Sequence, residues 1–244
     1  MQGSLGEDFA ALRKLRDDDA SGGVLKEFFG DSEDPREWED EDGDELVTVA
    51  DGRVTKLVLY KCTSLAALPD TIGELKALTE LVLYECSSLA ALPDAIGELK
   101  ALTGLNLYGC RSLTALPAAI GELKALTTLI LAECENLAAL PAAIGELGEL
   151  GRATWRDSAS LAVLAAAVGA LRARTALDLL GCSSLAAGPA TIGELKALTT
   201  LGLQVCSSLT ALPAASGELK ALTALYLLGC SSLVALPESI GGLD

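Results

Sequence analysis

The sequence predicts an α/β solenoid in which coils of 24 residues stack behind a separate N-terminal segment. The main observation is a frame that returns every 24 residues; it starts at Val54, Leu78, Leu102, Leu126, Leu150, Arg174, Leu198 and Leu222. The string GELKALT alone occurs five times. Within each frame an alternating apolar segment is followed by a proline and a short helical pattern. We therefore divide the chain into residues 1–53 and eight coils over residues 54–244.

Residues 1–53 are expected to form an acidic cap over the first coil, which would otherwise expose its apolar end. Two short helices are predicted from the apolar clusters Phe9, Leu12, Leu15 and Val24, Leu25, Phe28, Phe29. Residues 46–49, a turn at 50–53 and the chain from Val54 onward indicate a hairpin strand that leads into the first coil. This segment carries 17 acidic and 6 basic side chains, a net charge of −11 out of −16 for the whole chain.

Each coil is predicted to contain a strand, a bend and a short helical return. We number the positions of a coil from 1 to 24. Leucines at positions 4 and 6 alternate with other residues, which places positions 3, 5 and 7 on the opposite face of a strand. The proline at position 16 cannot donate a ladder hydrogen bond, so the strand must end before it. Positions 19 and 22 are apolar and three residues apart, as on one face of a helical turn.

The consensus LTxLxLxxCSSLxxLPxxIGELKA resembles the leucine-rich repeat, in the cysteine-bearing form of plant and algal intracellular resistance-like proteins and Ras-suppressor-like scaffolds. The resemblance covers residues 54–244. It implies a horseshoe with a parallel concave sheet and short helical turns on the convex side. It also implies a protein-interaction module that uses the concave face. Trp38 followed by GRVTKLVL resembles the caps of plant-type repeat proteins, although those caps usually carry a cysteine pair that is missing here.

Composition argues against several classes of function. The net charge of −16 disfavours binding to nucleic-acid backbones and to anionic membrane surfaces. The sequence has no apolar run of 18 residues, so no membrane insertion is predicted. The chain contains no histidine, the commonest general base and zinc ligand. It also lacks phosphate-binding, dinucleotide-binding and nucleophile-elbow motifs. We therefore expect neither an enzyme nor a cofactor.

Two features could bind metal, and for both the structural interpretation is favoured. The acidic run from Asp31 to Glu45 superficially resembles a calcium loop. With Gly43 at the sixth place, however, Trp38 and Val49 occupy the first and twelfth places, where carboxylates are required. A cysteine stands at position 9 in seven coils, and Ser158 replaces it in the fifth. One cysteine per coil suits a small residue under the bend better than a clustered metal site.

The concave face carries the candidate partner-binding residues. All four tyrosines fall on it: Tyr60, Tyr84 and Tyr108 at position 7 of the first three coils, and Tyr226 at position 5 of the last. Val58, Val82 and Asn106 occupy position 5 beside the first three. Exposed aromatic side chains on a rigid surface are typical binding anchors. The alternative is that stacked tyrosines only stabilise neighbouring strands.

The fifth coil departs from the consensus, with Ala153 and Trp155 at the inward positions. Arg152 and Arg156 are then expected on the concave face, with Asp178 on the next strand. These arginines form the only basic concentration in an acidic chain and could bind an acidic peptide or a phosphate. Drift in a degenerate coil is the alternative.

The sequence thus predicts a cytoplasmic scaffold or recognition module that binds a protein partner, and the resemblance adds a role in signalling or defence-like recognition. A second hypothesis is that the chain is the regulatory repeat segment of a larger receptor or enzyme. The last coil stops without a polar closing segment, so self-association through the C-terminal end is also expected.

Overall fold

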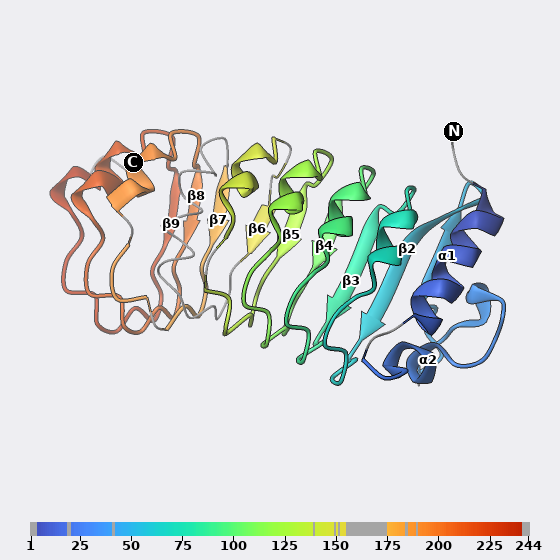
Figure 1. Ribbon diagram of the computed structural model, residues 1–244. Coiled ribbons are helices and arrows are strands. Elements are labelled where there is room, and N and C mark those ends of the chain that lie inside the picture. The colour runs from blue at the N-terminus through green and yellow to red at the C-terminus, as the bar shows by residue number, and fades with distance from the viewer. Residues whose placement is uncertain are drawn as a thin grey trace.

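The computed structural model describes residues 4–18, 21–40, 42–138, 140–148, 150, 152–154, 175–183, 185–188 and 190–240. In this part of the chain, nine strands form one sheet in sequence order, and the coils follow one another along an elongated array (Figure 1). The strands are β1 (Val47–Ala50), β2 (Arg53–Tyr60), β3 (Glu80–Tyr84), β4 (Gly104–Asn106), β5 (Thr128–Ile130), β6 (Arg152–Thr154), β7 (Ala176–Asp178), β8 (Thr200–Gly202) and β9 (Ala224–Tyr226).

The strands from β2 onward are parallel and in 24-residue register, as Leu57 opposite Leu81 and Leu81 opposite Leu105 show. Leucines at positions 4 and 6 are buried as far as Leu203, and Leu225 and Leu227 of the last coil are partly buried. Position 5 is partly exposed in Val58, Val82 and Asn106. The predicted inward and outward faces of the strands are therefore confirmed. From β4 onward each strand spans only positions 3 to 5, so the residue at position 7 lies beyond the end of the strand in these coils.

The returns on the opposite side are 3-10 turns. They are η2 (Asp70–Glu74), η3 (Asp94–Glu98), η4 (Ala118–Glu122), η5 (Ala142–Glu146), η6 (Ala190–Glu194), η7 (Ala214–Glu218) and η8 (Glu238–Ile240). The proline at position 16 precedes the turn, as Pro93 does with φ −70° and ψ 154°, instead of occupying its first residue. Position 20 must be glycine because a Cβ on Gly97 would lie 2.7 Å from the carbonyl oxygen of Ala119 in the next coil.

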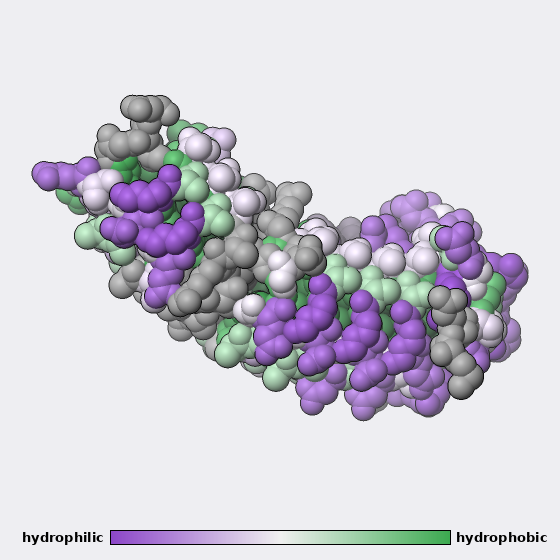
Figure 2. Space-filling view, turned by 90° about the horizontal axis from the view of Figure 1, so that it is seen from above, coloured by the Kyte–Doolittle hydropathy of each residue, from purple (hydrophilic) through white to green (hydrophobic). Residues whose placement is uncertain are grey.

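Three rows of hydrogen bonds and ion pairs join successive coils. Thr103 donates through Oγ1 to the carbonyl of Thr79 at 3.0 Å, and this contact recurs along the array. The Cys110 thiol donates to the carbonyl of Leu83 at 3.1 Å. On the 3-10 turns Lys100 pairs with Glu122 at 3.1 Å, one of several such pairs. Figure 2 shows hydrophilic side chains gathered in rows over this side of the molecule.

The N-terminal segment packs against the first coil through helix α1 (Leu5–Asp17), with helix α2 (Val24–Phe29) and the 3-10 turn η1 (Pro35–Glu37) beside it (Figure 1). Strand β1 pairs antiparallel with β2. Asp8 of α1 is buried, and its two carboxylate oxygens each accept a hydrogen bond from Arg53 at 2.8 Å. Asp8 also accepts from the backbone N–H of Val54 at 2.9 Å, which fixes α1 to the start of β2.

Candidate functional site: a tyrosine ladder on the concave sheet

Tyr60, Tyr84 and Tyr108 stack side by side and form what we call the tyrosine ladder. The ring centroids of Tyr60 and Tyr84 lie 5.2 Å apart with an interplanar angle of 16°, and those of Tyr84 and Tyr108 lie 4.7 Å apart at 5°. The parallel register of β2 and β3 places Tyr60 opposite Tyr84 and so sets the spacing of the rings. Tyr60 is 36% exposed and the other two are partly exposed, so the ladder presents aromatic surface to solvent.

Charged side chains hold both ends of the ladder. The Lys61 amine lies 4.7 Å from the centroid of the Tyr60 ring. Its side-chain hydrogen bond with Tyr60 raises the pKa of Lys61. At the other end the Tyr108 hydroxyl donates to Glu133, which also accepts from Arg111 at 2.9 Å. The bond to Glu133 raises the pKa of Tyr108 to about 12, and the same two partners lower the pKa of Glu133.

A shallow hollow of about 360 Å³ lies next to the ladder on the concave face. It forms where Gly104 leaves position 3 without a side chain, and Glu80, Val82, Asn106 and Ile130 are among its walls. The ladder and this hollow together give a surface with an aromatic ridge and a neighbouring depression.

Asn106 has a structural task besides any contact with a partner. Its Oδ1 accepts a hydrogen bond from the backbone N–H of Tyr108 at 2.9 Å, just after β4 ends. Asp178 does the same for Leu180 at 3.1 Å after β7. In both cases the strand is only three residues long, and the side chain accepts a hydrogen bond from the backbone N–H two residues further along the chain, just beyond the strand.

The remaining predicted residues are distributed unevenly. Tyr226 is 50% exposed but lies in β9, five strands beyond β4, so it is not part of the tyrosine ladder. Arg152 begins β6, and its side chain, like the whole of Arg156, lies outside the described residues. The predicted basic concentration in the fifth coil thus stays a prediction.

The cysteines take a structural position under the bend after each strand. None of the seven forms a disulfide, and six of them are buried. Burial raises the pKa of the Cys110 and Cys134 thiols, the latter to about 12. Within the described residues no group of three metal-ligating side chains comes together. In the same part of the chain, no helix has both the length and the apolar character to cross a membrane.

Two parts of the site could not be found from sequence patterns. Glu133 comes from position 8 of the fourth coil and reaches back to Tyr108. Phe28 comes from the N-terminal segment, where the apolar pattern predicted a helix but not that this residue and Tyr60 would line one cavity. The nearest signal for Glu133 is that position 8 of one coil adjoins position 7 of the coil before it.

No family model matches the sequence, and no curated protein matches it. Solved structures do match. The leucine-rich repeat domain of the type III effector XCV3220 (XopL) is 26% identical with a TM-score of 0.60, over 98% of this chain and 86% of that one. The leucine-rich repeat protein LIC12759 of Leptospira interrogans is 28% identical with a TM-score of 0.56, over 78% of this chain and 45% of that one. This chain therefore spans less than half the length of the Leptospira protein.

The leucine-rich repeat ectodomain of the Arabidopsis receptor kinase HAESA also matches, at 18% identity and a TM-score of 0.53, over 99% of this chain and 44% of that one. That identity shows the fold alone. Taken together, the parallel register, the convex 3-10 turns and these matches establish a leucine-rich-repeat solenoid. Proteins of this fold are commonly protein-interaction modules.

Proposed function

We propose that this chain is a protein-binding module that holds a segment of its partner against the tyrosine ladder on the concave face. The carrying observation is the stack of three partly exposed rings at 5.2 and 4.7 Å. Tyrosine combines a large apolar surface with a polar hydroxyl and has few rotatable bonds, so little side-chain entropy is lost on binding. Val58 and Val82 extend the apolar surface at position 5.

The surroundings of the ladder favour contact over a purely structural role. Strand pairing already fixes β2 against β3 through five residue pairs, so the fold does not need exposed rings for register. The hollow at Gly104 adds a depression that a side chain of the partner can enter. The HAESA ectodomain, a protein with the same fold, was solved with a peptide hormone ligand, which supports a peptide segment as one form of partner.

The test removes two rungs of the ladder and compares the proteins captured from a native extract by crosslinking. In the Tyr84→Ala/Tyr108→Ala variant we expect captured partners to bind at least about tenfold more weakly, because aromatic anchors contribute about 1–2 kcal/mol or more each. Tyr226→Ala is the matched control, since it removes an exposed tyrosine on a distant strand. An unchanged set of captured proteins, with both variants folded, would refute the proposal.

We also propose that the module works inside cells, in signalling or defence-like recognition. Seven cysteines in 244 residues, none of them in a disulfide, suit a reducing compartment, where disulfides do not form. The fifth-coil arginines Arg152 and Arg156 stay candidates for a second contact on the same face.

Self-association through the last described coil also stays a prediction. That coil exposes apolar side chains, with Leu228 83% and Val234 88% exposed. Analytical ultracentrifugation of a Leu228→Lys/Val234→Lys variant would test it.

A further inference from the structure

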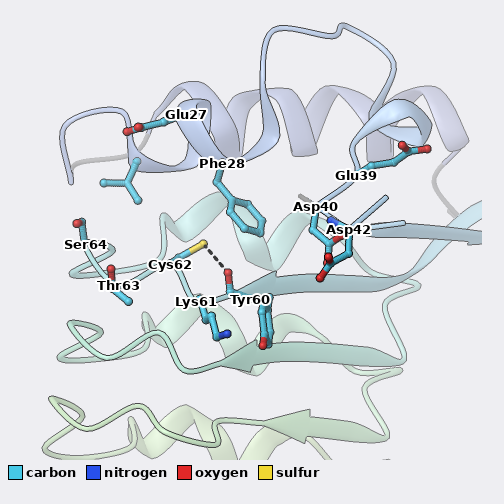
Figure 3. A pocket seen from close by; sticks show the side chains of 11 residues that line it. Glu27, Phe28, Glu39, Asp40, Asp42, Tyr60, Lys61, Cys62, Thr63 and Ser64 are labelled. Carbon is cyan, nitrogen blue, oxygen red and sulfur yellow. Dashed lines mark hydrogen bonds between the residues drawn. The ribbon is translucent and has the colours of Figure 1, made fainter. Parts of the chain in front are cut away.

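A cavity of about 670 Å³ lies between helix α2, the acidic segment that precedes β1, and the end of β2 (Figure 3). Its volume is within the range of about 300–1,000 Å³ that is usual for ligand sites. The cavity reaches the tyrosine ladder, because Tyr60, the first rung, forms part of its wall. A partner segment lying along the ladder would therefore meet this cavity at the N-terminal end.

Aromatic residues from two different parts of the chain line the cavity. Phe28 extends from α2 toward it, and Tyr60 lies on the opposite side at the end of β2 (Figure 3). Phe28 is held in place by an edge contact with Phe29, whose ring centroid lies 5.2 Å away. Faces of aromatic rings attract cations, and a guanidinium can also stack flat against them.

The cavity is strongly acidic. Of the side chains that line it in the described part of the chain, four are carboxylic, Glu27, Glu39, Asp40 and Asp42, and one, Lys61, is basic. The backbone N–H groups of Asp42 and Asp44 both donate to Asp40 Oδ1 at 2.9 Å, which fixes the loop that carries two of these carboxylates. The lining thus carries an excess of negative charge beside the aromatic ring of Phe28.

We propose that this cavity binds a cationic side chain of the partner, arginine in preference to lysine. This inference rests on the proposed function, because it assigns the chemistry of the residue at one end of the segment that the ladder holds. Arginine matches the lining on both counts: its planar cation stacks on the ring of Phe28, and its five N–H donors reach several carboxylates. A metal ion is disfavoured, since no group of three ligating side chains comes together within the described residues.

The experiment follows backbone amide shifts of the 15N-labelled full chain during titration with Nα-acetyl-arginine amide. The same titration with Nα-acetyl-citrulline amide, which has nearly the same shape but no charge, measures how much of the binding depends on charge. We expect saturable shifts for arginine at α2 and at residues 60–64, and at least about tenfold weaker binding of citrulline. Lysine amide is expected to bind more weakly than arginine amide.

Two double variants of equal charge change separate the cavity from the general acidity of the chain. Glu27→Gln/Asp42→Asn removes carboxylates on the cavity wall, and we expect it to weaken arginine binding by about fivefold or more. Asp70→Asn/Asp94→Asn removes two exposed carboxylates from the 3-10 turns, and its effect should stay below about twofold. Equal effects of the two variants, equal binding of citrulline, or tighter binding of Ca²⁺ at the same residues would overturn the inference.

The arginine titration needs no partner, so its outcome is separate from that of the ladder experiment. If arginine binds as expected but the Tyr84→Ala/Tyr108→Ala variant captures the same proteins as the unaltered chain, the proposed function fails and the cationic site remains. If partner capture needs the tyrosine ladder but arginine does not bind, the cationic site fails and the proposed function remains.

Discussion

Replacing Gly121 with alanine tests how closely the coils approach one another on the convex side. A Cβ added to Gly121 would lie 2.7 Å from both the Cβ and the carbonyl oxygen of Ala143 in the next coil, whereas ordinary contact begins at 3.4 Å. The two turns would have to separate by about 0.7 Å. They cannot separate freely, because the β4–β5 ladder and the Thr127 Oγ1 bond to Thr103, 3.0 Å long, hold the same two coils together.

Gly148→Ala is a matched control 27 residues further along the chain. No heavy atom of the described residues lies within 4 Å of a Cβ added there, and the φ of Gly148 lies outside the left-handed region. Both substitutions remove the same conformational freedom from the unfolded chain, worth about 0.4–1 kcal/mol. The difference between the two variants therefore isolates the clash in the folded state, for which overpacking predicts about 1–3 kcal/mol.

Urea denaturation followed by circular dichroism measures this difference. We expect Gly121→Ala to lower the unfolding midpoint and Gly148→Ala to leave it unchanged or raise it slightly. If Gly121→Ala unfolded at the same urea concentration as Gly148→Ala, then the close approach of the turns would not limit the stability of the array. The reasoning that makes glycine necessary at position 20 would then be refuted.

Four further outcomes follow from other contacts. Leu107→Asp buries an unpaired charge at a fully buried site and should abolish the cooperative thermal transition; a normal melting curve would contradict the inward face. The buried Cys134 thiol, with a pKa of about 12, should react with a disulfide reagent far more slowly in the folded chain than in urea, and equal rates would contradict its burial. Val205→Gly should stabilise the chain by about 0.5–1 kcal/mol in urea denaturation, since valine at φ 61° is strained; no gain would show that the strain is absent. The pKa of Tyr108 is raised from 10.0 to about 12, so the stabilisation from its bond to Glu133 is present below pH 10 and is lost as the pH rises toward 12. Tyr108→Phe should therefore remove the last step of the tyrosine absorbance titration. An unchanged titration would contradict this.

The regular parts of the fold are predictable from the sequence because each coil repeats the same choices. Alternation at Leu105 and Leu107 predicts which strand residues are buried, and the structure confirms it. The conformation at position 8 is harder to predict. It is left-handed at Gly109, which suits glycine, but also at Glu85 and Val205, where the residue type gives no such signal.

The candidate site shows the same division. The stacking of Tyr84 on Tyr108 follows from their 24-residue spacing, because equal positions of adjacent coils must lie one strand apart. The bond from Tyr108 to Glu133 joins two different positions of adjacent coils, and the cavity that Phe28 and Tyr60 share depends on where α2 lies relative to the end of β2. Such contacts are set by tertiary packing, for which a periodic pattern carries no information.

The cross-coil bonds also bear on how such a gene can change in length. The threonine, cysteine and lysine–glutamate contacts join residues that are 24, 27 and 22 apart, and these separations recur from coil to coil. Unequal recombination that adds or removes one complete unit would therefore recreate every junction it disturbs. Loss of a single codon within a unit would misalign all three kinds of contact at once, so viable length variants should differ by whole units.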